Sequence, residues 1–347
     1  MTPPIPKAKA KKGKQSRPAK SPKGQEQEQA STLPRELQQL LLDIFKNSFA
    51  EILESDIQPL LQEVKGHLYN RDFSAAFGRN DYLTAYSARW SPSRALGYLQ
   101  VLEDLKDHLL PLLQSTDEKN GTVCLGGGAG AEPVAFAGFL SLLKAAKTSE
   151  QEEKRLDLAV IDIADWSEVL QKLLHSITTA PPLSKYASAA VKAAAVPLVP
   201  VETLGLEFHQ HDILNTEFAL LRPLLEEAKL ITILFTLNEL YSASLSLTQR
   251  FLLNLTACLK EGAMLLVVDS PGSYSTVSLN GAEKKYPMHW LLDHTLLKQG
   301  PKGEPAEWSK VVEEESTWFR LREGLRYPIE LEHMRFQLHL YRKGESH

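Results

Sequence analysis

The residues best suited to bind a ligand lie in the middle of the chain, where four glycines fall between Gly126 and Gly130. A strand-like apolar run, Thr122–Leu125, leads into them, and an apolar stretch of helical character, Pro133–Leu143, follows. Glycine allows a sharp turn and lets a ligand lie against the backbone. Amides at the start of the following helix then face a polar ligand. The pattern predicts a nucleotide-like ligand held by Gly126, Gly127, Gly128 and Gly130.

Two classes of enzyme use such a loop. The spacing Gly126-x-Gly128-x-x-Ala131 satisfies the dinucleotide pattern and would suit an NAD(P)-dependent oxidoreductase. The spacing Gly126-x-Gly128-x-Gly130 is usual in S-adenosylmethionine-dependent methyltransferases. Glu132 follows directly, and its carboxylate suits the ammonium of a methionine moiety but would repel a pyrophosphate. These features favour the methyltransferase, with S-adenosyl-L-methionine as cofactor and Glu132 among the residues that bind it.

Carboxylates follow two further strand-like runs. Asp162 ends the run Leu158–Ile163, where an acid can accept both ribose hydroxyls of a nucleoside. Asp165 is a weaker candidate and suits a helix cap near Trp166. After the third run, Asp212 lies where an adenine amino group is commonly bound. Ile213 would pack against the adenine ring.

The fourth apolar run ends in two polar residues, Asn238 and Glu239. Ligands bind at the carboxyl ends of parallel strands, so these two are the candidate catalytic residues. The alternative is a helix cap by Asn238 with Glu239 in the first turn. The segment Asp269–Gly272 follows the fifth run and belongs to the same rim, with less specific content.

Metal binding is not expected. His209 and His211 share one face of the predicted third strand, but no third ligand lies nearby, so we interpret them as ordinary strand histidines. Cys124 and Cys258 lie in apolar runs without CxxC spacing, which argues against a zinc site or a disulfide framework and fits a reducing compartment. The chain has no apolar run of 18 residues, so we expect no membrane-spanning helix.

The strand-like runs alternate with helical stretches, which predicts a parallel sheet covered by helices on both faces. Two last runs have no helix between them and should pair antiparallel. The expected fold is α/β, a Rossmann-like class I methyltransferase sheet of seven mostly parallel strands with a terminal antiparallel hairpin. Residues 176–205 look like an insertion. The seven predicted strands are Thr122–Leu125, Leu158–Ile163, Leu206–His211, Leu230–Leu237, Ala263–Asp269, Ser316–Leu321 and Met334–Tyr341.

The chain divides into three regions, of which the last contains the alternating strands and helices. Residues 1–32 form a disordered basic tail, since residues 1–30 hold eight basic and two acidic side chains although the whole chain has a net charge of −4. Such a tail suits a nuclear address or contact with a polyanion, or is simply solvated. Residues 33–115 form a helical accessory region that begins with Thr32 as a cap and Pro34 in the first turn. Its further helices are expected at Ile57–Tyr69 and Pro92–Leu113. The methyltransferase domain is 116–347.

The chain resembles the fungal family of large-subunit ribosomal RNA uridine-N3 methyltransferases over most of 34–345. The most specific part is an Arg79–Arg94 block in the helical region, with Tyr86, Arg89, Trp90 and Pro92 at fixed spacing. The glycine loop and the segment Phe235–Tyr241 add to the likeness. In one respect the chain departs from the wider methyltransferase pattern, because the gap from Gly130 to Asp162 is long.

The resemblance implies a nucleolar enzyme that methylates N3 of a uridine in 25S-type ribosomal RNA, alone or in a pre-ribosomal particle, and we expect a monomer. Glu239 would take the N3 proton, and Asn238 would hold a uracil carbonyl. The arginines of the block can contact phosphates and its aromatic rings can stack on unpaired bases, unless the rings merely dock the helices. A non-catalytic RNA-binding assembly factor is the remaining alternative. The candidate RNA-binding residues are Arg79, Tyr86, Arg89, Trp90 and Arg94, with Tyr82 beside them.

Overall fold

Seven strands form one sheet in the order β3-β2-β1-β4-β5-β9-β8. The first five strands are parallel, β9 runs antiparallel to β5, and β8 runs antiparallel to β9. This topology confirms the predicted class I methyltransferase sheet with its terminal hairpin. The strands are β1 (Gly121–Leu125), β2 (Leu156–Asp162), β3 (Leu204–Gln210), β4 (Leu230–Leu234), β5 (Met264–Asp269), β8 (Trp308–Phe319) and β9 (Met334–Lys343).

The computed structural model describes residues 31–113, 121–146, 155–183, 185–189, 192, 195–272, 274–279, 282–299 and 305–344. All of them belong to one unit, Ser31–His347. Most of the predicted basic tail, 1–30, lies outside the described residues. Its expected end at residue 32 is too late, because the Ser31 hydroxyl already donates a hydrogen bond to Gln100.

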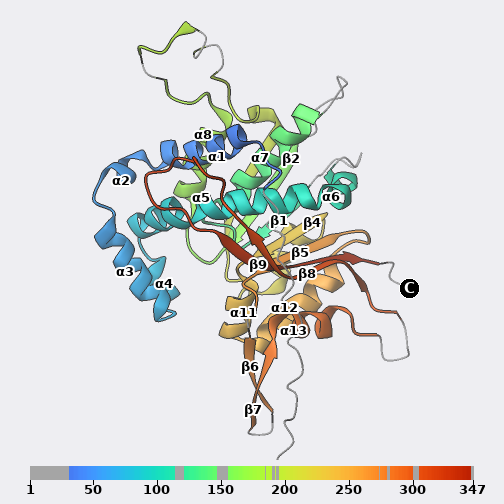
Figure 1. The fold of residues 1–347 in the computed structure, drawn as a ribbon. Coiled ribbons are helices and arrows are strands. Elements are labelled where there is room, and N and C mark those ends of the chain that lie inside the picture. The colour runs from blue at the N-terminus through green and yellow to red at the C-terminus, as the bar shows by residue number, and fades with distance from the viewer. Residues whose placement is uncertain are drawn as a thin grey trace, which may run out of the picture. The chain divides into compact units, whose positions relative to one another are not determined.

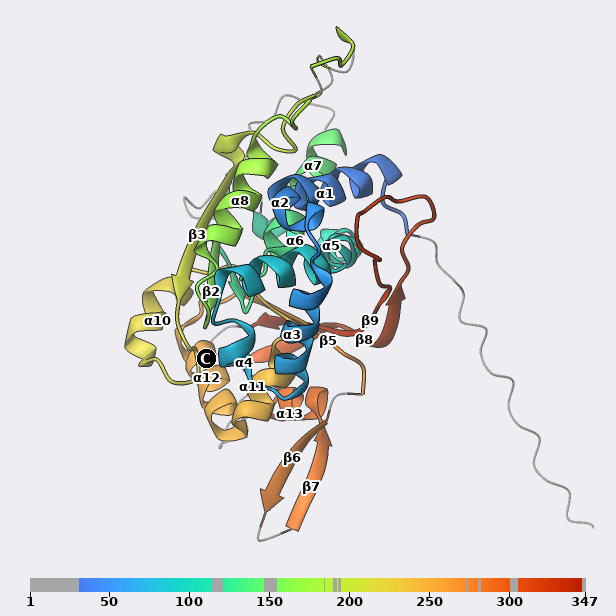
Figure 2. The same cartoon turned by 90° about the vertical axis from the view of Figure 1, so that its left-hand side faces the viewer.

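Helices cover both faces of the sheet, as Figures 1 and 2 show. Strands β4 and β5 are buried along their whole length and consist almost entirely of Leu, Ile, Val and Met, as parallel strands covered on two faces require. One face packs against α1 (Arg35–Ser48), α5 (Asn80–Asp104), α7 (Ala131–Ala146) and α8 (Ser167–Thr178). The other packs against α10 (Phe218–Leu225), α11 (Leu237–Ala243), α12 (Leu245–Cys258) and α13 (Met288–Leu296).

The N-terminal helices share a core with the sheet. Gly138 in α7 lets two leucines approach, since a β-carbon there would lie 3.0 Å from Leu99 of α5 and 3.1 Å from Leu41 of α1. The helical region expected over 33–115 is therefore built into the methyltransferase fold and is not a separate accessory layer. Its shorter helices are α2 (Ala50–Glu54), α3 (Gln58–Tyr69), α4 (Phe73–Ala76) and α6 (Lys106–Leu113).

Several boundaries differ from the sequence-based expectation. Helix α5 continues through Pro92, which was expected to begin a helix. Helix α1 has Pro34 at its N-cap and no side-chain cap, so Thr32 does not cap it. Strand β4 ends at Leu234, three residues early, because Phe235 has a left-handed backbone with φ of 56°.

Two strands were not expected. β6 (Tyr274–Leu279) and β7 (Ala282–Pro287) pair antiparallel as a separate hairpin between β5 and α13. In Figures 1 and 2 the hairpin extends away from the helices beneath the sheet. The expected insertion between the second and third strands contains the short 3-10 turn η1 (Val201–Thr203) directly before β3.

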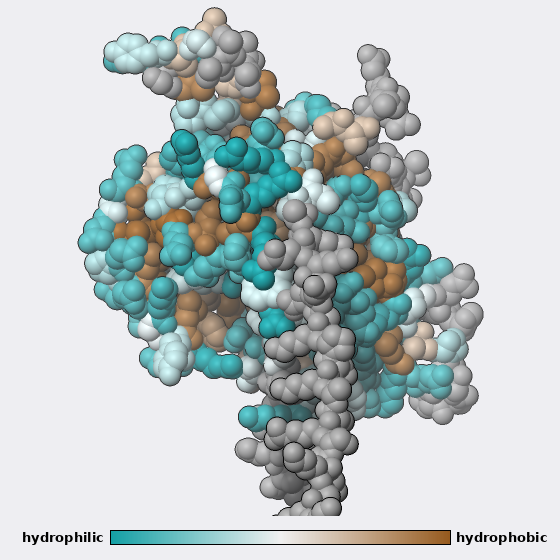
Figure 3. Space-filling model, viewed as in Figure 1, coloured by the Kyte–Doolittle hydropathy of each residue, from teal (hydrophilic) through white to brown (hydrophobic). Residues whose placement is uncertain are grey.

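The surface drawn in Figure 3 is mostly hydrophilic, with apolar residues interrupted by polar ones. Within the described part of the chain, every helix is too short or too polar to cross a membrane.

Candidate functional site

The glycine loop and the acid at the end of β2 lie together, as the sequence predicts. Gly128 donates its backbone N–H to Oδ2 of Asp162 at 3.0 Å, and Ala164 donates to Oδ1 at 3.3 Å. Burial raises the pKa of Asp162, although these backbone donors work in the opposite direction. Gly126 and Gly130 have positive φ angles of 78° and 83°, which explains why glycine is needed at both. The result is a half-buried carboxylate beside a glycine turn.

Protein neighbours, and not only a ligand, require the glycines. A β-carbon at Gly128 would overlap the indole of Trp166, and one at Gly126 would overlap the side chain of Thr236. Close approach of a ligand is therefore not the only reason that glycine is needed at these two positions. Trp166 directly precedes α8 and is 2% exposed, so it forms the floor of the loop.

Helix α5 holds the loop from the other side. The hydroxyls of Ser87 and Ser91, one helical turn apart, both donate to the carbonyl of Ala129, at 2.8 and 2.7 Å. Two further α5 residues, Tyr86 and Trp90, have ring centroids 4.9 Å apart, and Tyr86 lies 5.9 Å from Trp166. The predicted stacking residues thus lie beside the glycine loop. The sequence offered no signal for the two serines.

Glu132 lies beneath the loop and faces the core. It is 2% exposed and accepts a hydrogen bond from the hydroxyl of Thr232 in β4. Burial raises the pKa of its carboxyl to about 7, although the bonds from Thr232 and Cys124 act in the opposite direction. A cavity of about 10 Å³, lined in part by Glu132 and Thr232, has room for about one water. This placement differs from the expected contact with a methionine ammonium, because the side chain turns into the protein.

The end of β4 and the start of α11 are fixed by a buried acid. Asp269, at the end of β5, is 3% exposed and accepts the backbone N–H of Asn238 at 3.0 Å and that of Ser270 at 2.7 Å. The pKa of Asp269 is raised to about 6, mainly by burial and further by the negative charge of Glu239. The two backbone hydrogen bonds and the positive charge of Arg94 act in the opposite direction. Asp269 therefore holds the main chain at Asn238 in place, although the segment Asp269–Gly272 has little specific content in the sequence.

Arg94 points at the left-handed turn that follows β4. Its guanidinium carbon lies 5.0 Å from the ring centroid of Phe235, and Nη1 donates to the hydroxyl of Tyr86 at 3.2 Å. Tyr98, one turn further along α5, stacks on Phe235 with centroids 6.3 Å apart. Arg94 is thus drawn into the rim of the sheet, where it meets the charge of Asp269. The expectation of a surface phosphate contact does not fit this position.

Glu239 also belongs to the rim. It lies in the first turn of α11, and its Oε2 is 4.0 Å from Nη1 of Arg71. That oxygen is buried and accepts no hydrogen bond among the described residues. Both candidate catalytic residues therefore interact with Asp269. The backbone N–H of Asn238 is bonded to its carboxylate, and the charge of Glu239 raises its pKa.

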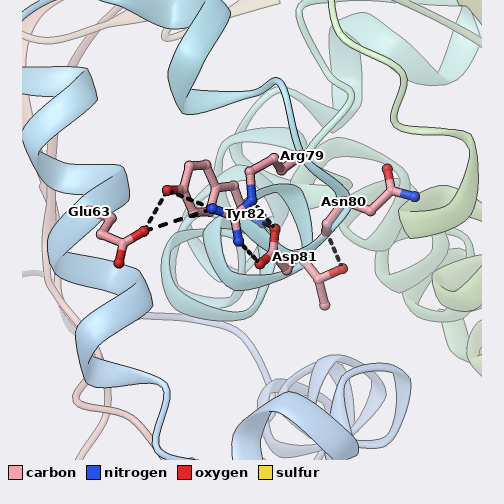
Figure 4. A network of polar contacts seen from close by, with 6 residues as sticks. Glu63, Arg79, Asn80, Asp81 and Tyr82 are labelled. Carbon is pink, nitrogen blue, oxygen red and sulfur yellow. Dashed lines mark hydrogen bonds and ion pairs between the residues drawn. The ribbon is translucent and has the colours of Figure 1, made fainter.

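Two other predicted RNA contacts are engaged within the protein. Arg79 bonds to the carboxylate of Asp81 and lies 4.0 Å from Glu63, with its guanidinium 4.2 Å over the ring of Tyr82, as Figure 4 shows. Arg89 is 8% exposed and pairs with Glu332. Arg89 is therefore a packing residue, which corrects its assignment as a phosphate contact.

The end of β3 contributes less than expected. Oδ1 of Asp212 accepts the backbone N–H of Leu214 at 3.0 Å, and Oδ2 accepts the side-chain amide of Asn215 at 2.7 Å, so its carboxylate closes its own turn. Ile213 packs against the cluster of α10–α13. In contrast, Ile163 directly follows Asp162 and is 57% exposed. The signal for Ile163 in the sequence is an apolar residue directly after the predicted ribose acid.

Asp165 bonds locally at the start of α8, close to the helix-cap role that the sequence offered as the alternative to ribose binding. Its Oδ1 accepts both the backbone N–H and the hydroxyl of Ser167, at 3.1 and 2.6 Å. Among the described residues, no three His, Cys, Asp or Glu side chains lie close enough together to hold a metal ion. His209 lies 3.6 Å from Glu207 in β3, and His211 follows the strand.

The rim has the groups that a nucleoside cofactor requires. Asp162 keeps lone pairs for hydroxyl donors after its two backbone bonds. Ile163 offers an exposed apolar surface at the same strand end, suited to an aromatic ring. The main chain of the glycine loop lies against the same carboxylate, to which the N–H of Gly128 is bonded. This acceptor and this apolar surface fit the ribose hydroxyls and the adenine ring of S-adenosylmethionine.

Comparisons with known proteins agree. The family model described as "Putative SAM-dependent methyltransferase" matches residues 45–342. A curated relative, the 25S rRNA (uridine(2843)-N(3))-methyltransferase of Saccharomyces cerevisiae, is 36% identical over 335 residues, which cover 90% of this chain and 87% of the relative.

Solved structures of similar proteins are more distant in sequence. A SAM-dependent methyltransferase from Methanosarcina mazei is 10% identical over 67% of this chain and 96% of that chain, with a TM-score of 0.35. The N-methyltransferase NodS from Bradyrhizobium japonicum, in complex with S-adenosyl-L-homocysteine, is 14% identical over 70% and 87%, with a TM-score of 0.32. The family match decides between the two enzyme classes that the glycine loop left open: the chain belongs to the family of S-adenosylmethionine-dependent methyltransferases.

Proposed function

We propose that this enzyme methylates N3 of a uridine in large-subunit ribosomal RNA. The observation that carries the proposal is that Asn238, Glu239 and Arg94 gather around Asp269 near the end of β4. The backbone N–H of Asn238 is bonded to the carboxylate of Asp269, and the charges of Glu239 and Arg94 both act on that carboxylate. The yeast relative, which acts on a uridine N3, supports the choice of target. The enzyme would work as a monomer in the nucleolus, on ribosomal RNA or a pre-ribosomal particle.

Binding of the cofactor falls to the ends of β1, β2 and β3. Asp162 would accept the ribose hydroxyls, and Ile163 would pack on the adenine. The glycines from Gly126 to Gly130 would let the main chain approach the cofactor closely. Asp212 and Ile213 would close the adenine side, as proposed from the sequence. When bound, S-adenosylmethionine supplies a methyl group on a sulfonium, an electrophile that needs no further activation.

The protein must handle one proton, because N3 of uracil carries a hydrogen that has to leave. Glu239 is the proposed base, since its Oε2 is buried and accepts no hydrogen bond within the described structure. Arg94 would stabilise the negative charge that spreads over N3 and the two carbonyl oxygens as the proton leaves. Asn238 would hold one of those carbonyls. Tyr86 and Trp90 would form the wall beside the entering base, in place of the surface contact first expected.

The test is to map modified nucleosides in ribosomal RNA from cells that lack this protein. We expect one N3-methyluridine of the large subunit to disappear and to return with the wild-type gene. Asp162→Ala should fail to restore it because the cofactor is not held. Glu239→Gln should restore little, since loss of a general base costs about 10²–10⁴ in rate.

The matched control is Asp165→Ala, which removes a neighbouring carboxylate that only closes its own turn. It should restore the modification fully. An unchanged set of N3-methyluridines in the deleted strain would refute the proposed substrate.

A further inference from the structure

Three stacked rings lie in a row on the outer face of α13. Tyr286, just before the helix, and Trp290 have ring centroids 4.8 Å apart with planes 16° apart. Trp290 and His294 follow at 5.2 Å with planes 1° apart. Trp290 is 45% exposed, and His294 is exposed as well. The opposite face of the helix carries its buried residues, Met288, Leu291, Leu292 and Leu296.

The exposed lysine side chains of residues 285–299 give this segment a positive charge. Lys285 and Lys298 flank the two ends and are both exposed. Asp293 is the acidic residue of 285–299, and it turns inward, where it accepts hydrogen bonds from Lys310 at 2.7 Å and from the hydroxyl of Tyr341 at 2.6 Å. An anionic partner can therefore approach the row without meeting an unpaired carboxylate from this segment.

The row adjoins the proposed catalytic rim. Helix α11, whose first turn carries Asn238 and Glu239, packs against both β6 and α13. The β6–β7 hairpin starts five residues after Asp269 and leads directly into α13. Figure 2 shows this arrangement, with the hairpin running out from beside α11 and α13. A strand of nucleic acid that leaves the rim on this side would meet the row next.

We infer that the row Tyr286–Trp290–His294 binds an unpaired stretch of the substrate RNA next to the target nucleotide. A base would continue the stack at the exposed His294 end, and Lys285 and Lys298 would contact the flanking phosphates. Aromatic faces bind unpaired bases regardless of sequence, whereas the bases of an intact duplex are already stacked and inaccessible. The identity of the RNA rests on the proposed function, but the preference for single strands does not.

The experiment uses the full-length protein and a labelled oligouridylate, single-stranded or annealed to oligoadenylate. Trp290→Ala should weaken binding of the single strand about tenfold or more, because each stacked base contributes that much. Trp290→Phe keeps a ring and should retain most of the affinity. Lys285→Ala with Lys298→Ala should flatten the log–log salt slope by about 0.7 for each lost phosphate contact.

The matched control is Trp318→Ala. Trp318 is 38% exposed and lies near two arginines, Arg320 at 4.6 Å and Arg335 at 5.6 Å, but on strand β8. It should bind the single strand as the wild type does. Equal affinities of Trp290→Ala and wild type, or equal losses in both tryptophan variants, would overturn the inference.

The two proposals fail separately. If Trp290→Ala binds RNA normally while the wild type still produces N3-methyluridine, the row alone is refuted. If the row binds single strands but the deleted strain loses no N3-methyluridine, the proposed substrate is refuted and the binding surface remains.

Discussion

Gly128 and Asp162 lie 34 residues apart in the chain, and the backbone N–H of the first is bonded to the carboxylate of the second at 3.0 Å. Because β1 and β2 are parallel neighbours, their carboxyl ends meet at one edge of the sheet. The bond fixes the carboxylate beside the loop and still leaves it acceptor capacity. Cofactor binding should therefore depend on this side chain.

Asp162→Ala should reduce the affinity for S-adenosylmethionine by about 10- to 100-fold, as expected when hydrogen bonds to a charged group are lost. Calorimetric titration measures the change directly. Asp165→Ala should stay within about twofold of wild type. An affinity unchanged in Asp162→Ala would move the ribose contact to another residue.

Gly128→Ala should lower the free energy of unfolding by about 1–3 kcal/mol, because the new methyl group overlaps the indole of Trp166. Denaturant unfolding is the measurement. Gly66→Ala in α3 is the control, since a β-carbon there meets nothing within 4 Å, and it should be neutral or slightly stabilising. Adding Trp166→Leu to Gly128→Ala should cost less than the two single changes together. Additive losses would show that the indole is not the obstacle.

Glu132 makes stability fall as the pH rises. Folded, its carboxyl keeps its proton to about pH 7, whereas in the unfolded chain it ionises near the ordinary 4.5. Between those values the unfolded state has released a proton that the folded state retains, so the wild type loses about 3 kcal/mol in all. The loss is complete above pH 7. Glu132→Gln should lack this decline, and unfolding curves from pH 4.5 to 8 compare the two. A difference between them that stays constant with pH would contradict the prediction.

Arg94→Met should move the rising limb of the pH–rate profile to higher pH by about one unit or more, because a nearby cation favours the deprotonated uracil. Arg94→Lys should restore much of the effect, and both variants should bind S-adenosylmethionine normally. Arg79→Ala, at the start of the same helix, is the exposed control and should leave the profile unchanged. A drop in rate without a shifted profile would mean that Arg94 only supports Phe235.

Removal of residues 1–30 should leave the melting temperature unchanged but take the protein out of the nucleus. Removal of 1–33 should also lower the melting temperature, because Leu33 is 1% exposed and Arg322 donates to the carbonyl of Ser31. Imaging of the tagged proteins tests the predicted localisation, and thermal unfolding tests the predicted melting temperatures. If the protein without residues 1–30 stayed in the nucleus, the interpretation of the tail as a nuclear localisation signal would be refuted.

The sequence alone was enough for the sheet and for the meeting of the glycine loop with the acid that follows β2. The alternation of apolar runs and helical stretches determines a parallel sheet, because each run must be buried on both faces. A glycine turn after one strand and an acid after the next must then meet, since parallel strands end at one edge. Gly128 and Asp162 follow from these local rules alone.

The roles of the long side chains were decided only by the tertiary structure. Arg79, Arg89 and Arg94 look alike in the sequence, yet one lies among exposed acids, one is buried against Glu332 and one reaches Phe235. The partners of the last two lie 243 and 141 residues away, on elements whose approach no local pattern specifies. Glu132 turned inward for the same reason, because its neighbours Thr232 and Tyr98 come from β4 and α5. Local periodicity sets where a residue sits on its own helix or strand, whereas burial and charge pairing depend on what packs against it.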